Sequence, residues 1–170
     1  RFAASGVNFT NAHCAAPLCN PSRAALMTGI RPSSSGVYDN NQPFRRSEKG
    51  RDAVTLTQHL RAVGYKAIGS GKIYHGGFPD SQSWDDYYPD NKGHDVPPSP
   101  RPPADKFPLN GIPRTANFDW GPIDNPDEEM GDFQVAKWVS SQLAKRHSDP
   151  MFIACGMTRP HLPWYVPKKY

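Results

Sequence analysis

The sequence has few cysteines, no long apolar run and no block of basic residues. Three cysteines in 170 residues are too few for a disulfide framework, although the sequence leaves a bridge between Cys14 and Cys155 open. No stretch of about 18 apolar residues is present, so we expect no membrane span. The net charge of +4 is not gathered into a Lys/Arg block, which argues against a nucleic-acid partner and agrees, weakly, with an anionic substrate.

Proline, in contrast, is abundant. The 19 prolines exceed average usage and predict long irregular loops, above all over residues 78–127, which show no sustained period. Aromatic side chains in this segment could line a carbohydrate pocket, or the excursion could be packed by its own aromatics; His94 is interpreted as solvated. The chain has neither an initial Met nor a signal peptide, and we interpret it as part of a longer protein.

Outside this segment, helix and strand signals alternate, which predicts an α/β domain with a mainly parallel sheet and flanking helices. The expected helices run over Ser22–Thr28, from Thr55 or Thr57 to Gly64, and from Asp127 to His147. The expected strands are Val7–Thr10, Tyr65–Ile68 and Met151–Cys155, and residues 31–49 are expected to be a loop.

The run from Cys19 to Gly29 carries the strongest chemical signal. Asn20 is a good N-cap, Pro21 suits the first helical position, and Gly29 suits the residue after the helix. Cys19 would then lie just before a helix N-terminus, where backbone N–H groups favour an anion, with Arg23 on the first turn. This predicts a nucleophile, an anion cradle and a cation within a few residues.

Basic side chains also follow two of the expected strands. Lys72 and His75 come after the strand Tyr65–Ile68, which ends in Gly-Ser-Gly, and His161 comes after Met151–Cys155. The carboxyl ends of parallel strands meet at one edge of a sheet, where ligands bind, so we expect these side chains to converge there. The plainer interpretation is a surface lysine with structural histidines.

Two plainer interpretations also exist for Cys19. It could be a buried structural cysteine in a helix-capping loop. It could also join His13 and Cys14 in a zinc site, although no second Cys/His pair at the usual spacing supports this.

The whole run resembles the sulfatase signature Cys-x-Pro-Ser-Arg-x-x-x-Leu-Thr-Gly, with Met27 in place of Leu. The block from Gly64 to His75 resembles a second sulfatase motif, and Met151–Pro163 resembles the segment in which an apolar strand ends in Pro-His-x-Pro. The segments Trp84–Tyr87 and Arg159–His161 resemble the iduronate-2-sulfatase-like branch. The resemblance runs from Gly6 to the C-terminus. It implies that residues 1–170 are a partial catalytic domain lacking the first strand and the C-terminal part, with residues 78–127 as an excursion within it.

The resemblance implies an alkaline-phosphatase-like fold and a sulfuric ester hydrolase acting on a sulfated sugar or glycosaminoglycan. It implies that a formylglycine-generating or sulfatase-modifying enzyme oxidises Cys19 to formylglycine, whose hydrate attacks sulfur with one hydroxyl and expels sulfate as the carbonyl reforms. Periplasmic, secreted or lysosomal location is implied as well. The alternatives are a phosphatase or phosphonate monoester hydrolase of the same fold, and an inactive carbohydrate-binding relative.

The resemblance also implies a role for each site residue. Arg23 and Lys72 would neutralise the sulfuryl oxygens, His75 would serve the leaving oxygen, and His161 would bind sulfate or move a proton. A Ca²⁺ or Mg²⁺ ion would be bound by the modified Cys19, with its other ligands outside these 170 residues. We therefore expect the fragment alone to be inactive, since one ligand does not retain a hard cation.

Overall fold

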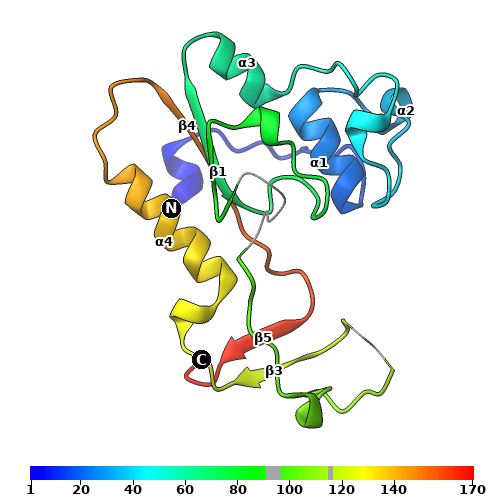
Figure 1. Ribbon diagram of the computed structural model, residues 1–170, viewed down its shortest axis with the longest axis vertical. Coiled ribbons are helices and arrows are strands. Elements are labelled where there is room, and N and C mark those ends of the chain that lie inside the picture. The colour runs from blue at the N-terminus through cyan, green and yellow to red at the C-terminus, as the bar shows by residue number, and fades with distance from the viewer. Residues whose placement is uncertain (91–96, 115–116) are drawn as a thin grey trace. The chain divides into compact units, whose positions relative to one another are not determined.

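The computed structural model describes residues 1–90, 97–114 and 117–170 (Figure 1). The chain divides into an N-terminal unit, Arg1–Ala53, and a C-terminal unit, Val54–Tyr170. His94 lies outside the described residues. In the described part of the chain no helix is long and apolar enough to cross a bilayer.

The N-terminal unit consists of short helices and turns. The helices are α1 (Cys19–Thr28) and α2 (Pro32–Ser35), which contact each other, and the 3₁₀ turns are η1 (Phe2–Ser5) and η2 (Phe44–Arg46). The strand expected over residues 7–10 is absent: Val7 and Phe9 are both exposed, and an alternating pattern makes no strand without a pairing partner. Residues 31–49, expected to be a loop, include α2, which starts at a proline and ends at Gly36 in the left-handed conformation.

The C-terminal unit contains the predicted parallel sheet. Strands β1 (Lys66–Gly71), β2 (Asp86–Tyr88) and β4 (Met151–Gly156) lie in the order β2-β1-β4, and both pairings are parallel. Helix α3 (Leu56–Ala62) precedes β1, and Thr55, one of the two caps that the sequence offers, is its N-cap. Thr55 also forms a capping box with Gln58. This sheet confirms the α/β prediction.

A second sheet and a longer helix complete this unit. Strands β3 (Trp120–Ile123) and β5 (Trp164–Pro167) pair in parallel, and α4 (Gly131–Leu143) contacts β1 and β4. Helix α4 starts later than predicted because the acidic residues that precede it form the 3₁₀ turn η5 (Asp127–Glu129). The remaining 3₁₀ turns are η3 (Ser81–Ser83) and η4 (Ala104–Lys106).

The described residues of the segment 78–127 include more regular structure than the lack of a period in the sequence indicates. They contribute β2 and β3, which have three and four residues and are too short to show an alternating pattern. Trp84 and Tyr87 are buried over β1, where a Cβ on Gly69 would lie 2.8 Å from the Tyr87 ring. These two aromatics therefore belong to the core, which favours the packing interpretation over a sugar-binding role for them.

Candidate active site

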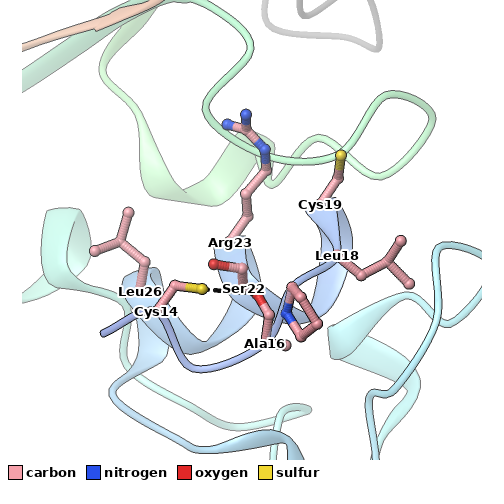
Figure 2. A pocket seen from close by; sticks show the side chains of 8 residues that line it. Cys14, Ala16, Leu18, Cys19, Ser22, Arg23 and Leu26 are labelled. Atoms are coloured by element: carbon pink, nitrogen blue, oxygen red, sulfur yellow. Dashed lines mark hydrogen bonds between the residues drawn. The ribbon is translucent and has the colours of Figure 1, made fainter. Parts of the chain in front are cut away.

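Cys19 and Arg23 lie one turn apart on α1. The helix begins at Cys19 itself, with Leu18 as N-cap, and ends at Gly29 with φ of 71° as predicted. Figure 2 shows the Cys19 thiol and the Arg23 guanidinium extending to the same side of the helix. Both residues are half-buried and line an open hollow of about 460 Å³ together with Cys14, Leu18 and their neighbours (Figure 2). The nucleophile and the cation therefore share one surface.

The expected N-cap role of Asn20 is wrong. Its side chain is buried and its Nδ2 donates to the carbonyls of Asp39 (2.8 Å) and Gln42 (2.7 Å). Its backbone N–H donates to Asn40 Oδ1 at 3.0 Å. An N-cap side chain would bond to its own helix, whereas Asn20 joins the start of α1 to the turn over residues 38–42.

These bonds also leave fewer backbone N–H groups at the start of α1 for an anion than the sequence predicts. The Asn20 N–H is occupied, Pro21 has none, and the Ser22 N–H donates to the Leu18 carbonyl at 3.1 Å. Among these first positions of α1, the Cys19 N–H alone has no acceptor in the described residues. Attraction of an anion here therefore depends on the Arg23 charge and the helix dipole more than on a row of backbone donors.

Lys72 lies where β1 meets the end of β4. It directly follows β1, and its N–H donates to the Gly156 carbonyl at 2.8 Å. Gly71 has φ of 85°, and a Cβ there would lie 1.9 Å from the Gly156 oxygen. A Cβ on Gly156 would in turn lie 2.6 Å from the Lys72 backbone. Two glycines thus allow the segments after both strands to start in backbone contact.

A buried polar cluster supports the loop that carries His75. The Tyr74 and Thr55 hydroxyls each lie 2.9 Å from Ser83 Oγ, which also donates to the Asp80 carboxylate. All four residues are buried. A satisfied buried network of this kind restrains the chain around it, here the residues on both sides of half-buried His75. The His75 ring itself packs near Phe78, with ring centres 6.0 Å apart.

His161 lies in an exposed turn five residues after β4. Its N–H donates to the Thr158 carbonyl at 3.0 Å, and its Nδ1 lies 2.8 Å from the Leu162 carbonyl. A carbonyl only accepts, so Nδ1 carries a proton and donates. In the neutral ring Nε2 then carries the lone pair and can accept a proton, and once protonated it can donate a hydrogen bond to an anion.

The site residues thus fall into two groups. The N-terminal unit brings Cys19 and Arg23 together, and the C-terminal unit brings the backbone of Lys72 to the end of β4, from which the His161 turn begins. The convergence of the two groups into one site remains a prediction.

Sequence reasoning missed a buried carboxylate in the C-terminal unit. Asp119 is fully buried and accepts from the Tyr165 hydroxyl at 2.7 Å and from the N–H groups of Leu109, Asn110 and Trp120. Burial acts to raise the pKa of Asp119, but these four donors outweigh it and lower the pKa below the usual value. Burial and the Asp119 charge raise the pKa of Tyr165 to about 12. The donors come from three separate segments, so no local motif indicates this site.

Neither a metal centre nor a disulfide is formed by the described residues. No group of three or more His, Cys, Asp or Glu side chains there could hold a metal ion. The zinc interpretation of His13, Cys14 and Cys19 is therefore wrong for the described residues. The Ca²⁺ or Mg²⁺ site stays a prediction, because Cys19 is the one ligand expected from these 170 residues. Cys14, Cys19 and Cys155 are all free thiols.

Comparison with known proteins gives matches along the whole chain. The sulfatase family model matches residues 1–170. A protein named sulfatase from Formosa agariphila is 39% identical over 178 aligned residues, which cover 100% of this chain and 35% of that protein. Human iduronate 2-sulfatase is 27% identical over 180 aligned residues, covering 100% of this chain and 32% of the enzyme. The chain thus spans about a third of the length of these relatives.

Two solved structures share the fold. One, in complex with its substrate D-glucosamine-2-N,6-O-disulfate, has a TM-score of 0.53 at 17% identity and covers 90% of this chain and 27% of its own. The other, the phosphonate monoester hydrolase of Agrobacterium radiobacter, has a TM-score of 0.54 at 17% identity, with 91% and 34% covered. At this identity they show the fold alone, and they confirm the expected alkaline-phosphatase-like architecture.

Proposed function

Because this chain belongs to the sulfatase family, we propose that the full-length protein hydrolyses sulfate esters of sulfated sugars, with a formylglycine made from Cys19 as nucleophile. The single observation that carries the proposal is the start of α1. There the family signature puts Cys19 on the first helical residue and Arg23 one turn later, on the same side of the helix (Figure 2). A substrate related to sulfated iduronate is the finer part of this proposal, supported by the full-chain match to iduronate 2-sulfatase.

Formylglycine would supply a nucleophile that releases sulfate without a stable adduct, which a thiol does not. The chain's own side chains do the remaining work. Arg23 offers two parallel N–H donors to sulfuryl oxygens, and Lys72 offers a compact positive charge. Both stabilise the charge that gathers on these oxygens as the sulfur–oxygen bond breaks.

The histidines would handle protons. His75 would hold or protonate the leaving oxygen, because a sugar alkoxide is too basic to leave without a proton. His161 keeps Nδ1 bonded to the Leu162 carbonyl, so its Nε2 would accept a proton in the neutral ring and would donate to sulfate in the imidazolium. No step is assigned to a metal ion, since the described residues do not form its site. A periplasmic, secreted or lysosomal location remains a prediction.

The test uses the full-length protein made with and without a co-expressed formylglycine-generating enzyme. We expect the peptide that contains Cys19 to lose mass only with that enzyme, and activity on a sulfated monosaccharide to appear with the mass change. Cys19→Ala should abolish both. Cys14→Ala is the matched control for the mass change, since the Cys14 thiol bonds to the Ala16 carbonyl before the helix begins, and its peptide should still lose mass at Cys19.

The competing functions give different results in the same experiment. A phosphatase or phosphonate monoester hydrolase would prefer an aryl phosphate or phosphonate ester over the matched aryl sulfate. An inactive carbohydrate-binding relative would bind the sugar and turn over none of these esters. An active preparation in which Cys19 is still open to alkylation would refute the formylglycine mechanism.

A further inference from the structure

The aspartate near the start of α4 holds the backbone that leads to His161. Asp132 Oδ1 accepts from the Thr158 N–H at 2.7 Å, and Oδ2 accepts from the Arg159 N–H at 2.9 Å. One carboxylate thus bonds to two consecutive amides, 26 and 27 positions along the chain. Hydrogen bonds to an ionised acceptor are stronger than neutral ones, so this is a firm attachment.

Asp132 does not serve its own helix in this way. The N-cap of α4 is Met130, and no side chain caps the helix. Asp132 lies on the first turn of α4, where the helix dipole stabilises its negative charge. Its field also reaches the end of β4, since burial and then the Asp132 charge raise the pKa of Cys155. The side chain is therefore directed at the strand end.

The two bonded amides begin the turn that presents the histidine. The Thr158 carbonyl accepts from the His161 N–H, and the Pro160 carbonyl accepts from the Trp164 indole. The Thr158 hydroxyl is buried with no hydrogen-bond partner in the described residues. A buried hydroxyl without a partner destabilises the fold, so the turn needs other bonds to keep Thr158 in this position.

We propose that Asp132 is a positioning residue for the reaction: it fixes the Thr158–Arg159 backbone and thereby the direction of the His161 ring. The proposal rests on the proposed function for the role of His161, while the attachment itself stands on the two hydrogen bonds. Removal of the carboxylate frees two donors at the end of β4 and lets the turn rearrange.

The test compares Asp132→Ala and Asp132→Asn with Glu129→Gln in the full-length protein. Asn keeps the shape but turns an N–H₂ group toward one of the two donors. Glu129 is an exposed acid before the same helix that bonds to Asn125 and not to the strand end, so it is the matched control. Amide hydrogen exchange is measured on the peptide over residues 157–163, and kcat/KM on a sulfated sugar.

Both Asp132 variants should speed exchange in that peptide and lower kcat/KM by roughly tenfold or more, whereas Glu129→Gln should change neither. In a His161→Ala background, loss of Asp132 should cost less than about twofold, because the residue acts through His161. Unchanged exchange, or an equal cost in both backgrounds, would overturn the proposal. If the wild-type protein made with the formylglycine-generating enzyme hydrolyses no sulfate ester, the proposed function fails, while the exchange rates still decide whether Asp132 holds the turn.

Discussion

The helix start that carries Cys19 and the strand ends that carry Lys72 and His161 are held by different kinds of contact. The start of α1 is joined to one nearby turn by neutral hydrogen bonds from Asn20. The strand ends depend on the register of β1 and β4 and on the charged Asp132 attachment from α4. The contacts at the start of α1 are local in sequence, whereas those at the strand ends join residues that are far apart in sequence.

This difference predicts how substitutions in each region should affect activity and the free energy of unfolding. Substitutions of Cys19 and Arg23 on α1 should lower activity with little effect on the free energy of unfolding, because both side chains are only half-buried. Changes around β1 and β4 should lower both, because the sheet and the site share the same contacts.

The largest effect is expected for Arg23→Lys. The change keeps the charge on α1 but removes the planar pair of donors, so kcat/KM on a sulfated sugar should fall about a hundredfold, the scale of losing one transition-state donor. The melting temperature of the variant should stay close to that of the wild-type protein. Arg31→Lys is the control, since Arg31 is an exposed residue before α2. Kinetics of Arg23→Lys equal to those of the control would make Arg23 a structural residue.

A smaller and substrate-dependent effect is expected at the strand end. Lys72→Ala should reduce kcat/KM alike on a sugar sulfate and on an activated aryl sulfate, because its charge serves the sulfate in both. His75→Ala should reduce it far more on the sugar sulfate, whose leaving oxygen needs a proton. His161→Ala should follow Lys72→Ala if His161 binds sulfate, and His75→Ala if it serves the leaving group. Equal losses on both substrates for His75→Ala would leave His75 as another sulfate ligand.

The sequence predicts those parts of the molecule that depend on short-range signals. The N-cap Thr55, one of two that the sequence offers, the end of α1 at Gly29 and the strands β1 and β4 follow from local residue chemistry and are confirmed. The family motifs around Cys19, Lys72 and His161 are likewise contiguous.

Contacts between distant segments are the part that could not be predicted. Strands β2, β3 and β5 are three or four residues long and exist because a neighbour pairs with them. Asn20 has the residue type of an N-cap, yet the carbonyls of the 38–42 turn offer its amide better partners than its own helix does. The attachment by Asp132 joins residues 26 apart, which no local period reveals.

Asn20→Ala tests the hydrogen bonds that join the start of α1 to the turn over residues 38–42. The change removes both side-chain hydrogen bonds and leaves the Asp39 and Gln42 carbonyls without this donor, at a cost of about 1–3 kcal/mol. We expect roughly a tenfold loss of kcat/KM from a displaced Cys19, and faster amide exchange over residues 38–42. Asn41→Ala is the matched control, because exposed Asn41 uses only its backbone N–H, toward Asp39. Full activity of Asn20→Ala would show that α1 positions Cys19 without this turn.

The smallest effect on activity is expected for Tyr165→Phe in the C-terminal unit. The variant loses the hydroxyl donor of buried Asp119, which keeps its three backbone donors. At neutral pH the variant should unfold more easily by about 1 kcal/mol or somewhat more, the scale of a hydrogen bond to a charged group. Its kcat/KM should stay unchanged, since neither residue belongs to the proposed site.

The pH dependence of the stability loss tests whether the hydrogen bond from Tyr165 to Asp119 causes that loss. The pKa of Tyr165 is about 12 in the folded protein, against 10 for the free side chain, so between these values the unfolded chain has released a proton that the folded chain retains. The stability from this group is therefore complete below pH 10 and is lost as the pH rises toward 12. The difference in free energy of unfolding between the wild-type protein and Tyr165→Phe should be constant up to pH 10 and become smaller above pH 10. Denaturant titrations at neutral pH and above pH 10 measure this difference. A difference that does not narrow would mean that the Tyr165→Phe change destabilises the protein through packing and not through the lost bond to Asp119.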